Sequence, residues 1–451
     1  MGKPDATRLF GTDGIRSRFG QFPLDETSLK RLGKVLGLLW EGKKVLLGRD
    51  TRESGPECQH RIISGMDRTV ELTDIGVIST PGFSYIMDHS DFDFGVMLTA
   101  SHNPYVDNGI KIFDGKGEKI SETLEREIEI FFEETPAKGS DTPGQPEPAT
   151  SGPERDSLHN LYINFLKNET VDLRLDDLRC VVDCANGATH LIAPIVFGMP
   201  GFDAHVFNIH PDGKNINDRC GSTHPDAMRG AMDSFGAELG IAFDGDGDRV
   251  LFMDRRGRLL DGDHALVVMS DFLDRTDPRF NKNVVGTIMS NLGMEKALER
   301  RGIKLIRTAV GDKRVYAEMT RRGAVLGGEP SGHIILRHLQ KSGDGILSAL
   351  FFLKSLSALD LKIEHIWETI PMFPQVTRNI PIIRKRDLDS WPELNERIGA
   401  FEETYGKNGR VVVRYSGTEP KIRIMMEAGE IGTIENNIGD FVRLIKTNLG
   451  D

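Results

Sequence analysis

Cysteine is scarce in this sequence, and the spacing of the cysteines argues against metal binding. The 451 residues include four cysteines, of which only Cys180 and Cys184 lie close together. No second pair of ligands stands near them, which argues against a zinc site. We therefore expect the cysteines to be reduced, small apolar side chains of a cytoplasmic protein.

Long apolar runs and an excess of basic residues are also missing. No apolar run approaches the roughly 18 residues that a membrane-spanning helix needs, and residues 1–10 lack the apolar segment of a secretory signal. Acidic residues outnumber basic ones, 68 to 57, for a formal net charge of −11. General nucleic-acid binders usually carry a basic face. We therefore expect no nucleic-acid partner, no membrane partner and a cytoplasmic location.

Short apolar runs that lead into polar turns recur along the chain. One set covers residues 45–48, 181–182 and 284–288, and a second set leads into ASHNP, DGDGDR and EPSGH. Short buried strands alternating with helix-like stretches predict a parallel or mixed α/β sheet, and the spacing indicates one unit that occurs three times. Ligands of such sheets gather at the carboxyl ends of strands. If the three units face one cleft, the three polar loops converge there.

Two changes of composition divide the chain. Residues 134–155 are rich in Pro, Gly and Ser, which predicts a linker or long surface loop, and residues 121–133 before them predict a serine-capped helix. After about residue 368, two strands flank YSGTEPK, and residues 434–449 predict an amphipathic helix. The expected class is α/β, with three similar α/β sheet units and a smaller C-terminal α+β domain around a central cleft. The expected domain boundaries are 1–150, 151–255, 256–368 and 369–451.

Three carboxylates alternate with glycine in residues 244–249 (DGDGDR), directly after an apolar run. Glycine permits a tight turn that gathers the carboxylates, which would repel one another without a cation. Hard oxygen ligands favour Mg²⁺ or Ca²⁺. An EF-hand loop is excluded because Arg249 and Arg255 stand where it needs Gly and Glu. The alternative is a polar turn with fortuitous acids. The candidate metal ligands are Asp244, Asp246 and Asp248.

A serine follows another apolar run in residues 99–113 (TASHNPYVDNGIKIF). Ser101 could be a hydrolase nucleophile or a carrier of phosphoryl groups, but the G-x-S-x-G turn of α/β-hydrolases is missing. His102 is an immediate neighbour, which is badly placed to act as the base for Ser101, and Lys111 follows ten residues on. A serine that faces a metal loop suits phosphoryl transfer, because the cation neutralises charge on the moving group.

Three further polar loops carry candidate binding residues. Residues 329–333 (EPSGH) offer a carboxylate and a hydroxyl for vicinal sugar hydroxyls, while His333 alone is more often a structural histidine. Residues 414–423 (RYSGTEPKIR) combine hydroxyls, a glycine and two arginines that suit a phosphate, and the alternative is an ordinary hairpin turn. Arg16, at the end of residues 11–16 (GTDGIR), could reach a phosphate or belong to a surface turn.

Taken in order, these strings resemble the α-D-phosphohexomutase superfamily, and within it most of all the phosphoglucosamine mutases. The resemblance runs over residues 10–427 and is carried by GTDGIR, TASHNPYVDNGIKIF, DGDGDR and SGTEP. It implies an intramolecular phosphotransferase that interconverts glucosamine 6-phosphate and glucosamine 1-phosphate through a phosphoserine and a 1,6-bisphosphate. The alternatives are a phosphomannomutase/phosphoglucomutase and a non-catalytic phosphosugar- or cation-binding protein.

The resemblance also implies a role for each candidate residue. Ser101 would be phosphorylated, and its phosphate would bind one Mg²⁺ per chain together with the three aspartates. Arg16 and Lys111 would lie near the reacting oxygens, Lys111 as a candidate general acid/base, and His102 is grouped with them as catalytic. The implied substrate-binding residues are Arg249, Glu329, Ser331, His333, Arg414, Ser416, Gly417, Thr418 and Arg423.

The partner that the resemblance implies is a small phosphosugar, with glucosamine 1,6-bisphosphate as intermediate and activator, and a homodimer is left open. Three positions depart from the family pattern. Pro330 stands where relatives commonly have a polar or longer side chain, and Tyr415 occupies a variable position. Residues 311–319 (GDKRVYAEM) differ from the usual GDRYV-type string, so Lys313 and Arg314 are left out of the predicted site.

Overall fold

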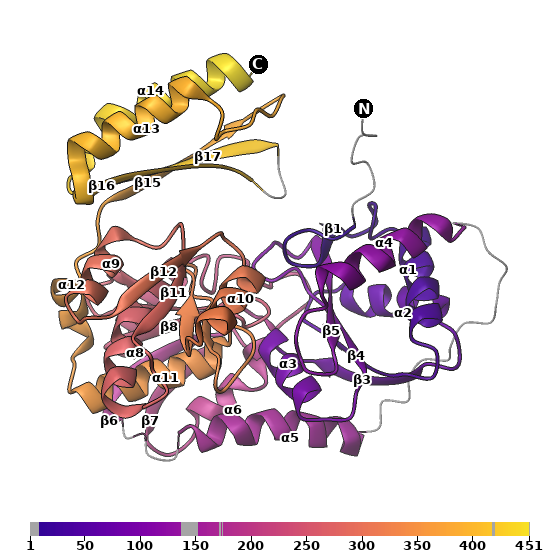
Figure 1. Cartoon of the computed structure of the whole chain (residues 1–451). Helices are drawn as coiled ribbons and strands as arrows, with labels where there is room; N and C mark the ends of the chain where they lie inside the picture. The colour runs from indigo at the N-terminus through magenta and orange to yellow at the C-terminus, as the bar shows by residue number, and fades with distance from the viewer. Residues whose placement is uncertain (1–8, 137–151, 171–172, 174, 417–419, 451) are drawn as a thin grey trace.

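The computed structural model of the chain describes residues 9–136, 152–170, 173, 175–416 and 420–450. It contains three α/β units in succession and a C-terminal unit of strands and helices seated over the third (Figure 1). The predicted fold class is therefore confirmed. No helix in these ranges combines the length and the apolar character that crossing a bilayer requires.

The first unit is built on a five-stranded sheet. Its elements are β1 Ile15–Arg18, α1 Glu26–Leu39, β2 Lys44–Arg49, α2 Gly55–Gly65, β3 Glu71–Val77, α3 Thr80–Asp88, β4 Phe94–Leu98, β5 Asp107–Asp114 and α4 Glu122–Glu134. The strand order is β1-β5-β4-β2-β3, and β5 is antiparallel to both of its neighbours. The predicted helix α4 begins after Ser121, whose hydroxyl accepts a hydrogen bond from the N–H of Leu124.

The second unit repeats this arrangement. Its elements are α5 Gly152–Asn168, β6 Leu175–Asp183, η1 Ala188–His190, α6 Ala193–Phe197, β7 Phe202–Phe207, α7 Asp226–Phe235, β8 Leu239–Phe243, β9 Val250–Asp254 and β10 Leu259–Leu260. The order is β10-β9-β8-β6-β7, with β9 antiparallel to both neighbours. The start of α5 corrects one prediction, because residues 152–155 of the expected linker are helical; residues 137–151 lie outside the described residues.

The third unit has the same central strands. Its elements are α8 Gly262–Thr276, β11 Asn283–Thr287, α9 Leu292–Glu299, β12 Lys304–Thr308, α10 Asp312–Arg322, β13 Leu326–Gly328, β14 Ile334–Leu336, α11 Gly345–Leu359, η2 Ile363–His365 and α12 Ile366–Thr369. The order is β12-β11-β13-β14, with β14 antiparallel to β13. The predicted threefold repeat is therefore present in the strand order, and each polar loop joins the last parallel strand to the antiparallel strand.

The C-terminal unit is smaller and has a three-stranded antiparallel sheet in the order β15-β17-β16. Its elements are β15 Gln375–Pro381, α13 Pro392–Tyr405, η3 Gly406–Asn408, β16 Gly409–Tyr415, β17 Lys421–Ala428 and α14 Ile431–Leu449. The two helices cover one face of the sheet (Figure 1). The two strands and the closing helix expected after residue 368 are therefore present.

The apolar cores divide the molecule differently from the sheets. One buried cluster runs through the first three units, from Leu46 on β2 through Phe243 on β8 to Ile370. Helix α5 lies against α3 and β3 of the first unit and against α6 of the second. The C-terminal unit has a separate buried cluster that includes Trp391 and Phe441. The first three units therefore form one body, which we call the three-unit body.

Polar contacts join the C-terminal unit to this body. The buried Glu427 on β17 pairs with Arg410 on β16 at 2.6 Å and accepts the N–H of Leu292 at 3.4 Å. Arg410 also donates to the carbonyl oxygen of Ser290 at 2.8 Å. We call these four residues the joint. It holds the C-terminal sheet against the start of α9.

Candidate active site

Ser101 lies in the loop between β4 and β5, at the carboxyl end of a buried parallel strand. Its φ of 53° is in the left-handed region, which costs a non-glycine residue about 1 kcal/mol. Its carbonyl oxygen accepts hydrogen bonds from Arg52 Nη2 and Asn217 Nδ2, each at 2.9 Å. Its N–H donates to Thr99 Oγ1. Buried groups of two units therefore fix the direction of the Ser101 hydroxyl.

That hydroxyl points at the metal loop, as we call residues 244–249. Ser101 Oγ donates to Asp244 Oδ2 at 2.7 Å. The three aspartates of the loop are buried, and one carboxylate oxygen from each lies within 4.8 Å of the others. Burial, together with the charges of Asp248 and Asp246, raises the pKa of Asp244 well above its usual range. A cation among the three carboxylates would remove this cost.

The carboxylate oxygens of the loop fit a magnesium ion. Among the described residues, Asp246 Oδ1 and Asp248 Oδ1 are buried without a hydrogen-bond partner. The other oxygen of Asp246 is occupied, since it accepts Thr80 Oγ1 at 2.6 Å and Lys111 Nζ at 2.9 Å. Buried carboxylate oxygens without donors are costly unless a cation binds them. An all-oxygen set of this kind suits Mg²⁺.

Two helix N-termini hold the metal loop. The N–H of Thr80, at the start of α3, donates to the carbonyl oxygen of Asp246 at 2.9 Å. The N–H of Gly345, at the start of α11, donates to the carbonyl oxygen of Gly247, also at 2.9 Å. The N-terminus of a helix carries a partial positive charge. The first and third units therefore stabilise an acidic loop that belongs to the second.

Lys111 lies on β5 and is almost fully buried beside the metal loop. Its Nζ is 2.9 Å from Asp246 Oδ2 and 3.5 Å from Asp248 Oδ2. A third carboxylate, that of Asp13, lies 3.3 Å away. Burial alone would lower the pKa of Lys111, but the charges of the three carboxylates raise it above its usual range. Lys111 is therefore held as an ammonium group at the metal loop.

Asp13 connects several cations of the first unit. It pairs with Lys111, with Lys119 and with Arg16, and Arg16 also donates to the carbonyl oxygen of Ala100 at 3.4 Å. Burial alone would raise the pKa of Asp13, but these cations hold it well below its usual range. Asp13 thus links Arg16 and Lys111, the two cations for which the family resemblance implies a place near the reacting oxygens.

The two predicted histidines have different surroundings. His102 Nδ1 is 3.4 Å from Ser101 Oγ, and burial, with the charges of Arg249 and Arg16, lowers the pKa of His102 to about 4. His333 Nδ1 is 3.6 Å from Asp248 Oδ2. Burial alone would lower the pKa of His333, but its bond to Asp248 and the nearby carboxylates raise it. His102 is therefore neutral near pH 7, and His333 brings the third polar loop to the metal loop.

The third polar loop, residues 329–333, contacts the start of α10 and lies near Arg249. Glu329 Oε1 accepts the N–H of Gly311 at 3.0 Å, and Ser331 Oγ is 3.5 Å from Glu329 Oε2. Arg249 donates its N–H to Asp244 Oδ1 at 3.2 Å, and Glu329 is among the carboxylates that raise the pKa of Arg249 against the effect of its burial. The predicted convergence of the three loops is therefore seen in these contacts.

The fourth predicted loop lies between β16 and β17. Arg414 and Arg423 are directly opposite each other on these strands. Burial and the charge of Arg423 lower the pKa of Arg414, and Glu329 acts in the opposite direction. Ser416 is buried, and its N–H donates to the carbonyl oxygen of Lys421 at 2.8 Å. Gly417 and Thr418 lie outside the described residues.

Several residues of the site were not identified from the sequence. Asp13 belongs to GTDGIR, from which only Arg16 was selected. Arg52 lies in the polar turn after β2 and Thr80 shortly after β3, and both support the residues around Ser101. Asp312 comes from the departing string of residues 311–319 and pairs with Lys119. Arg52, Thr80 and Asp312 lie within a few residues after a strand, which was the signal available for them, whereas Asp13 precedes β1 and carried no such signal.

Comparison with known proteins matches successive parts of the chain to the domains of one protein family. The chain matches the family phosphoglucomutase/phosphomannomutase over four successive stretches. These are alpha/beta/alpha domain I at residues 7–138, domain II at 160–257, domain III at 261–373 and the C-terminal domain at 379–436.

Curated relatives match over almost the same span. The chain is 41% identical over 429 residues to a phosphoglucosamine mutase of Thermus thermophilus, with 94% of each chain covered. It is 39% identical over 447 residues to a phosphoglucosamine mutase of Carboxydothermus hydrogenoformans, covering 97% of this chain and 99% of the relative.

Solved structures share the fold at lower identity. A phosphoglucomutase/phosphomannomutase family protein of Burkholderia thailandensis superposes with a TM-score of 0.78 at 21% identity, covering 99% of this chain and 100% of that one. An N-acetylphosphoglucosamine mutase of Aspergillus fumigatus, solved with GlcNAc-6P and magnesium, gives a TM-score of 0.68 at 19% identity, covering 99% and 97%. At these identities the likeness concerns the fold.

Proposed function

The chain belongs to the phosphoglucosamine mutase family, and from this premise we propose that it interconverts glucosamine 6-phosphate and glucosamine 1-phosphate through a phosphorylated Ser101. The enzyme is an intramolecular phosphotransferase, because the phosphoryl group ends on another oxygen of the same sugar. The observation that carries the proposal is the 2.7 Å hydrogen bond from Ser101 Oγ to Asp244, within a cluster of buried carboxylates.

The proposed reaction has two phosphoryl transfers. The free sugar hydroxyl attacks the phosphorus of phospho-Ser101, the bond from phosphorus to Ser101 Oγ breaks, and glucosamine 1,6-bisphosphate forms. The bisphosphate then reverses, and Ser101 Oγ attacks its other phosphoryl group. Each transfer releases one proton from the attacking hydroxyl and delivers one to the departing oxygen. Lys111 is our candidate for this exchange: its ammonium group would give a proton to the departing oxygen, and the amine so formed would take the proton of the attacking hydroxyl. Lys111 pairs with Asp246, in the same carboxylate cluster that Ser101 contacts through Asp244.

Asp244, Asp246 and Asp248 would hold one Mg²⁺ together with the phosphate on Ser101. When bound, the ion would neutralise charge on the moving phosphoryl group. Arg249 and Arg16 would stabilise the remaining charge. The two orphaned oxygens of Asp246 and Asp248 support this ligand set.

The other loops would hold the substrate. Glu329 and Ser331 would accept and donate hydrogen bonds to vicinal hydroxyls of the sugar, with His333 beside them. Arg414 and Arg423 would bind the phosphate that is not being transferred. Two cations directly opposite on antiparallel strands repel each other, and a phosphate between them would remove that cost. Ser416, Gly417 and Thr418 would complete this site, which we call the phosphate grip.

The decisive experiment is to incubate the enzyme with glucosamine phosphate labelled on phosphorus and to map the label by peptide mass spectrometry. We expect the label on Ser101. Ser101→Ala should lower turnover at least about a thousandfold, while calorimetry should show substrate affinity within a few-fold of wild type. Ser17→Ala, in which a serine that bonds to the Phe22 carbonyl is changed, is the control and should stay active.

The substrate is tested separately with a panel of glucosamine, glucose and mannose 6-phosphates. The highest kcat/KM is expected for the glucosamine compound. A higher value for either hexose would contradict the proposed substrate. If Ser101→Ala kept a substantial share of activity, the phosphoserine route would be wrong.

A further inference from the structure

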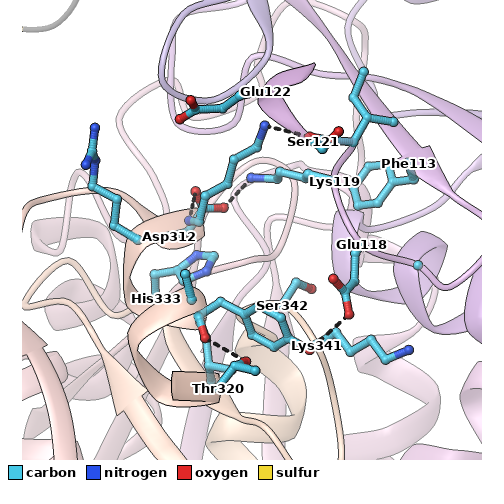
Figure 2. A pocket seen from close by; sticks show the side chains of 17 residues that line it. Phe113, Glu118, Lys119, Ser121, Glu122, Asp312, Thr320, His333, Lys341 and Ser342 are labelled. Carbon is cyan, nitrogen blue, oxygen red and sulfur yellow. Dashed lines mark hydrogen bonds and ion pairs between the residues drawn. The ribbon is translucent and has the colours of Figure 1, made fainter. Parts of the chain in front are cut away.

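A cavity of about 610 Å³ lies between the first and third units beside the site. One wall is formed by Phe113 near the end of β5 and by residues 117–122 after it, and the other by α10 with His333, Ile335, Lys341 and Ser342. Figure 2 shows Lys119 extending from the first wall toward Asp312 on the second, with His333 next to Asp312. The two units therefore meet through a charged contact at the edge of the catalytic residues.

Lys119 has two carboxylate partners from different units. Its ammonium group bonds to Asp13 in the first unit and to Asp312 at the start of α10 in the third. The side chain is only 10% exposed. Asp13 lies 106 residues before Lys119 in the chain and Asp312 lies 193 residues after it, yet both carboxylates bond to the same Lys119 nitrogen. A buried ammonium group held by two carboxylates has little freedom to move.

The same contact continues to the metal loop. Asp13 bonds to Lys119 on one side and lies 3.3 Å from Lys111 on the other. Lys111 in turn lies 2.9 Å from Asp246. Charges therefore alternate without a break from the third unit to the metal loop. We call this series the charge ladder; its members are Asp312, Lys119, Asp13, Lys111 and Asp246.

We propose that Lys119 is a positioning residue for catalysis, which fixes Asp13 and through it Lys111 and Arg16, and that it does so only while α10 is docked on the first unit. This inference rests on the proposed function, which places Lys111 and Arg16 at the reacting oxygens. Lys119 itself does not touch the metal loop. Its effect passes through Asp13, which would otherwise be shared by Lys111 and Arg16 alone.

A neighbouring lysine provides a matched control. Lys313 on α10 bonds to Glu125 on α4 and donates to the carbonyl oxygen of Ile120 at 3.1 Å, so it crosses the same interface. No contact recorded for the described residues links Lys313 to Asp13 or to the metal loop. Loss of Lys313 therefore weakens the docking of the two units without removing a member of the charge ladder.

The test compares Lys119→Met, Lys119→Arg and Lys313→Met in full-length enzyme, by steady-state kinetics in both directions and by thermal unfolding. Displacing a catalytic group by about an ångström costs about a hundredfold in rate, and loss of a supporting partner typically costs ten- to a hundredfold. We expect Lys119→Met to lower kcat by roughly ten- to a hundredfold with KM within about twofold. Lys119→Arg should recover most of the loss, because arginine can bond both carboxylates.

Lys313→Met should lower the melting temperature about as much as Lys119→Met, but it should leave kcat within about twofold of wild type. A double variant, Asp13→Asn with Lys119→Met, should be no slower than Asp13→Asn alone, because Lys119 acts through Asp13. Asp312→Asn removes only the third-unit end of the charge ladder. It serves as the second test if Lys119→Met does not fold, and it should lower kcat several-fold.

Each result bears on one claim. If Lys119→Met and Asp312→Asn keep the kcat of Lys313→Met, the positioning role is wrong. Additive losses in the double variant would also overturn it, because Lys119 would then act independently of Asp13. A wild-type enzyme that shows no turnover, or no label on Ser101, would instead contradict the proposed function, so the two failures are distinguishable.

Discussion

Ser101 and the metal loop belong to the three-unit body, through which one apolar cluster runs, whereas Arg414 and Arg423 lie in the C-terminal unit, whose buried cluster is separate. The Ser101 peptide is fixed by buried donors from the first and second units, and the metal loop is held by helix N-termini from the first and third. The C-terminal unit, by contrast, contacts the three-unit body through the polar joint at Glu427 and Arg410.

This difference in attachment corresponds to two tasks of the proposed site, the transfer of a phosphoryl group and the holding of a phosphate. Phosphoryl transfer needs reacting groups that keep their geometry, and the shared core supplies that rigidity. Holding a phosphate needs only charge and hydrogen-bond donors, which can be delivered by a unit attached through polar contacts. Changes within the three-unit body should therefore act on kcat, and changes in the C-terminal unit on KM.

After Ser101→Ala, the largest effect is expected from Asp246→Asn in the three-unit body. The change removes one negative charge from the metal loop, so Mg²⁺ affinity should fall by more than about tenfold and turnover by about a hundredfold or more. Calorimetry with Mg²⁺ alone and a coupled assay measure the two. The melting temperature should stay close to that of the control Asp233→Asn, which changes an exposed aspartate paired with Arg229. Full wild-type activity in excess chelator would contradict the metal assignment.

A smaller loss, confined to KM, is expected from Arg423→Ala in the phosphate grip. A charge-assisted hydrogen bond is worth about 1.5–3 kcal/mol, so kcat/KM should fall roughly ten- to a hundredfold. Because the grip does not touch the moving group, the penalty should be similar for the 6-phosphate and the 1-phosphate. Arg378→Ala, on the neighbouring strand β15, is the control.

The overall equilibrium constant fixes the ratio of the kcat/KM values in the two directions. Steady-state kinetics therefore cannot show which half-reaction has slowed. Each half-reaction of Arg423→Ala is therefore measured with phosphorylated and dephosphorylated enzyme. Slowing of only one half-reaction would show that the loop is not shared between the two orientations of the bisphosphate. A loss in kcat rather than KM would contradict the separation of tasks between the body and the C-terminal unit.

A still smaller effect is expected from Glu427→Gln in the joint. The change leaves Arg410 without its buried carboxylate partner, which should destabilise the attachment by about 3 kcal/mol. KM should rise several-fold in both directions while kcat changes little, since no group of the three-unit body moves. Calorimetric unfolding should show the C-terminal unit melting earlier. A drop in kcat larger than the rise in KM would show that the joint also shapes the metal site.

The smallest effect is a change in pH dependence from Asp344→Asn inside the body. Burial raises the pKa of Asp344 to about 6, although the N–H of Leu347 and the hydroxyl of Tyr162 act against it. In the unfolded chain the pKa is about 3.9, so folding is favoured by this group at low pH. That contribution is complete below about pH 4 and is lost as the pH rises through about 6.

The asparagine variant lacks this titration. Its stability relative to wild type should therefore improve by about 1 kcal/mol between about pH 5 and about pH 7. Urea unfolding at the two pH values measures the difference, and kcat should be unchanged. A constant difference between variant and wild type would show that Asp344 does not titrate in this range.

The sequence identified those parts of the site that follow a strand directly. The apolar run before DGDGDR and the run before ASHNP locate Asp244 and Ser101, and the structure places these two side chains 2.7 Å apart. The threefold alternation of strand and polar loop was visible because it depends on local patterns. The expected domain boundaries and the roles of the site residues stay predictions, which the experiments above address.

What the sequence could not supply were the contacts between units. Asp13, Lys119 and Asp312 come from three separate strings, and nothing local shows that their charges meet. Arg52 looks like a surface arginine in a polar turn, yet it is buried and bonds to the Ser101 carbonyl. The predicted linker extends four residues into α5, because Gly152 and Pro153 are typical loop residues although they begin this helix.

The shared apolar core also constrains how the chain can be made. Its members extend from Leu46 to Ile370, so a nascent chain that has left the ribosome only as far as the second unit would still expose much of that surface. Domains generally fold during synthesis as their own cores become complete. Here the cluster shared by the three units is completed late, after about four-fifths of translation, although the first unit also has a buried cluster of its own between Leu9 and Phe132. The C-terminal unit follows with its separate cluster. A stop codon before residue 370 would leave an aggregation-prone fragment, whereas one just after it would leave a closed body without a phosphate grip.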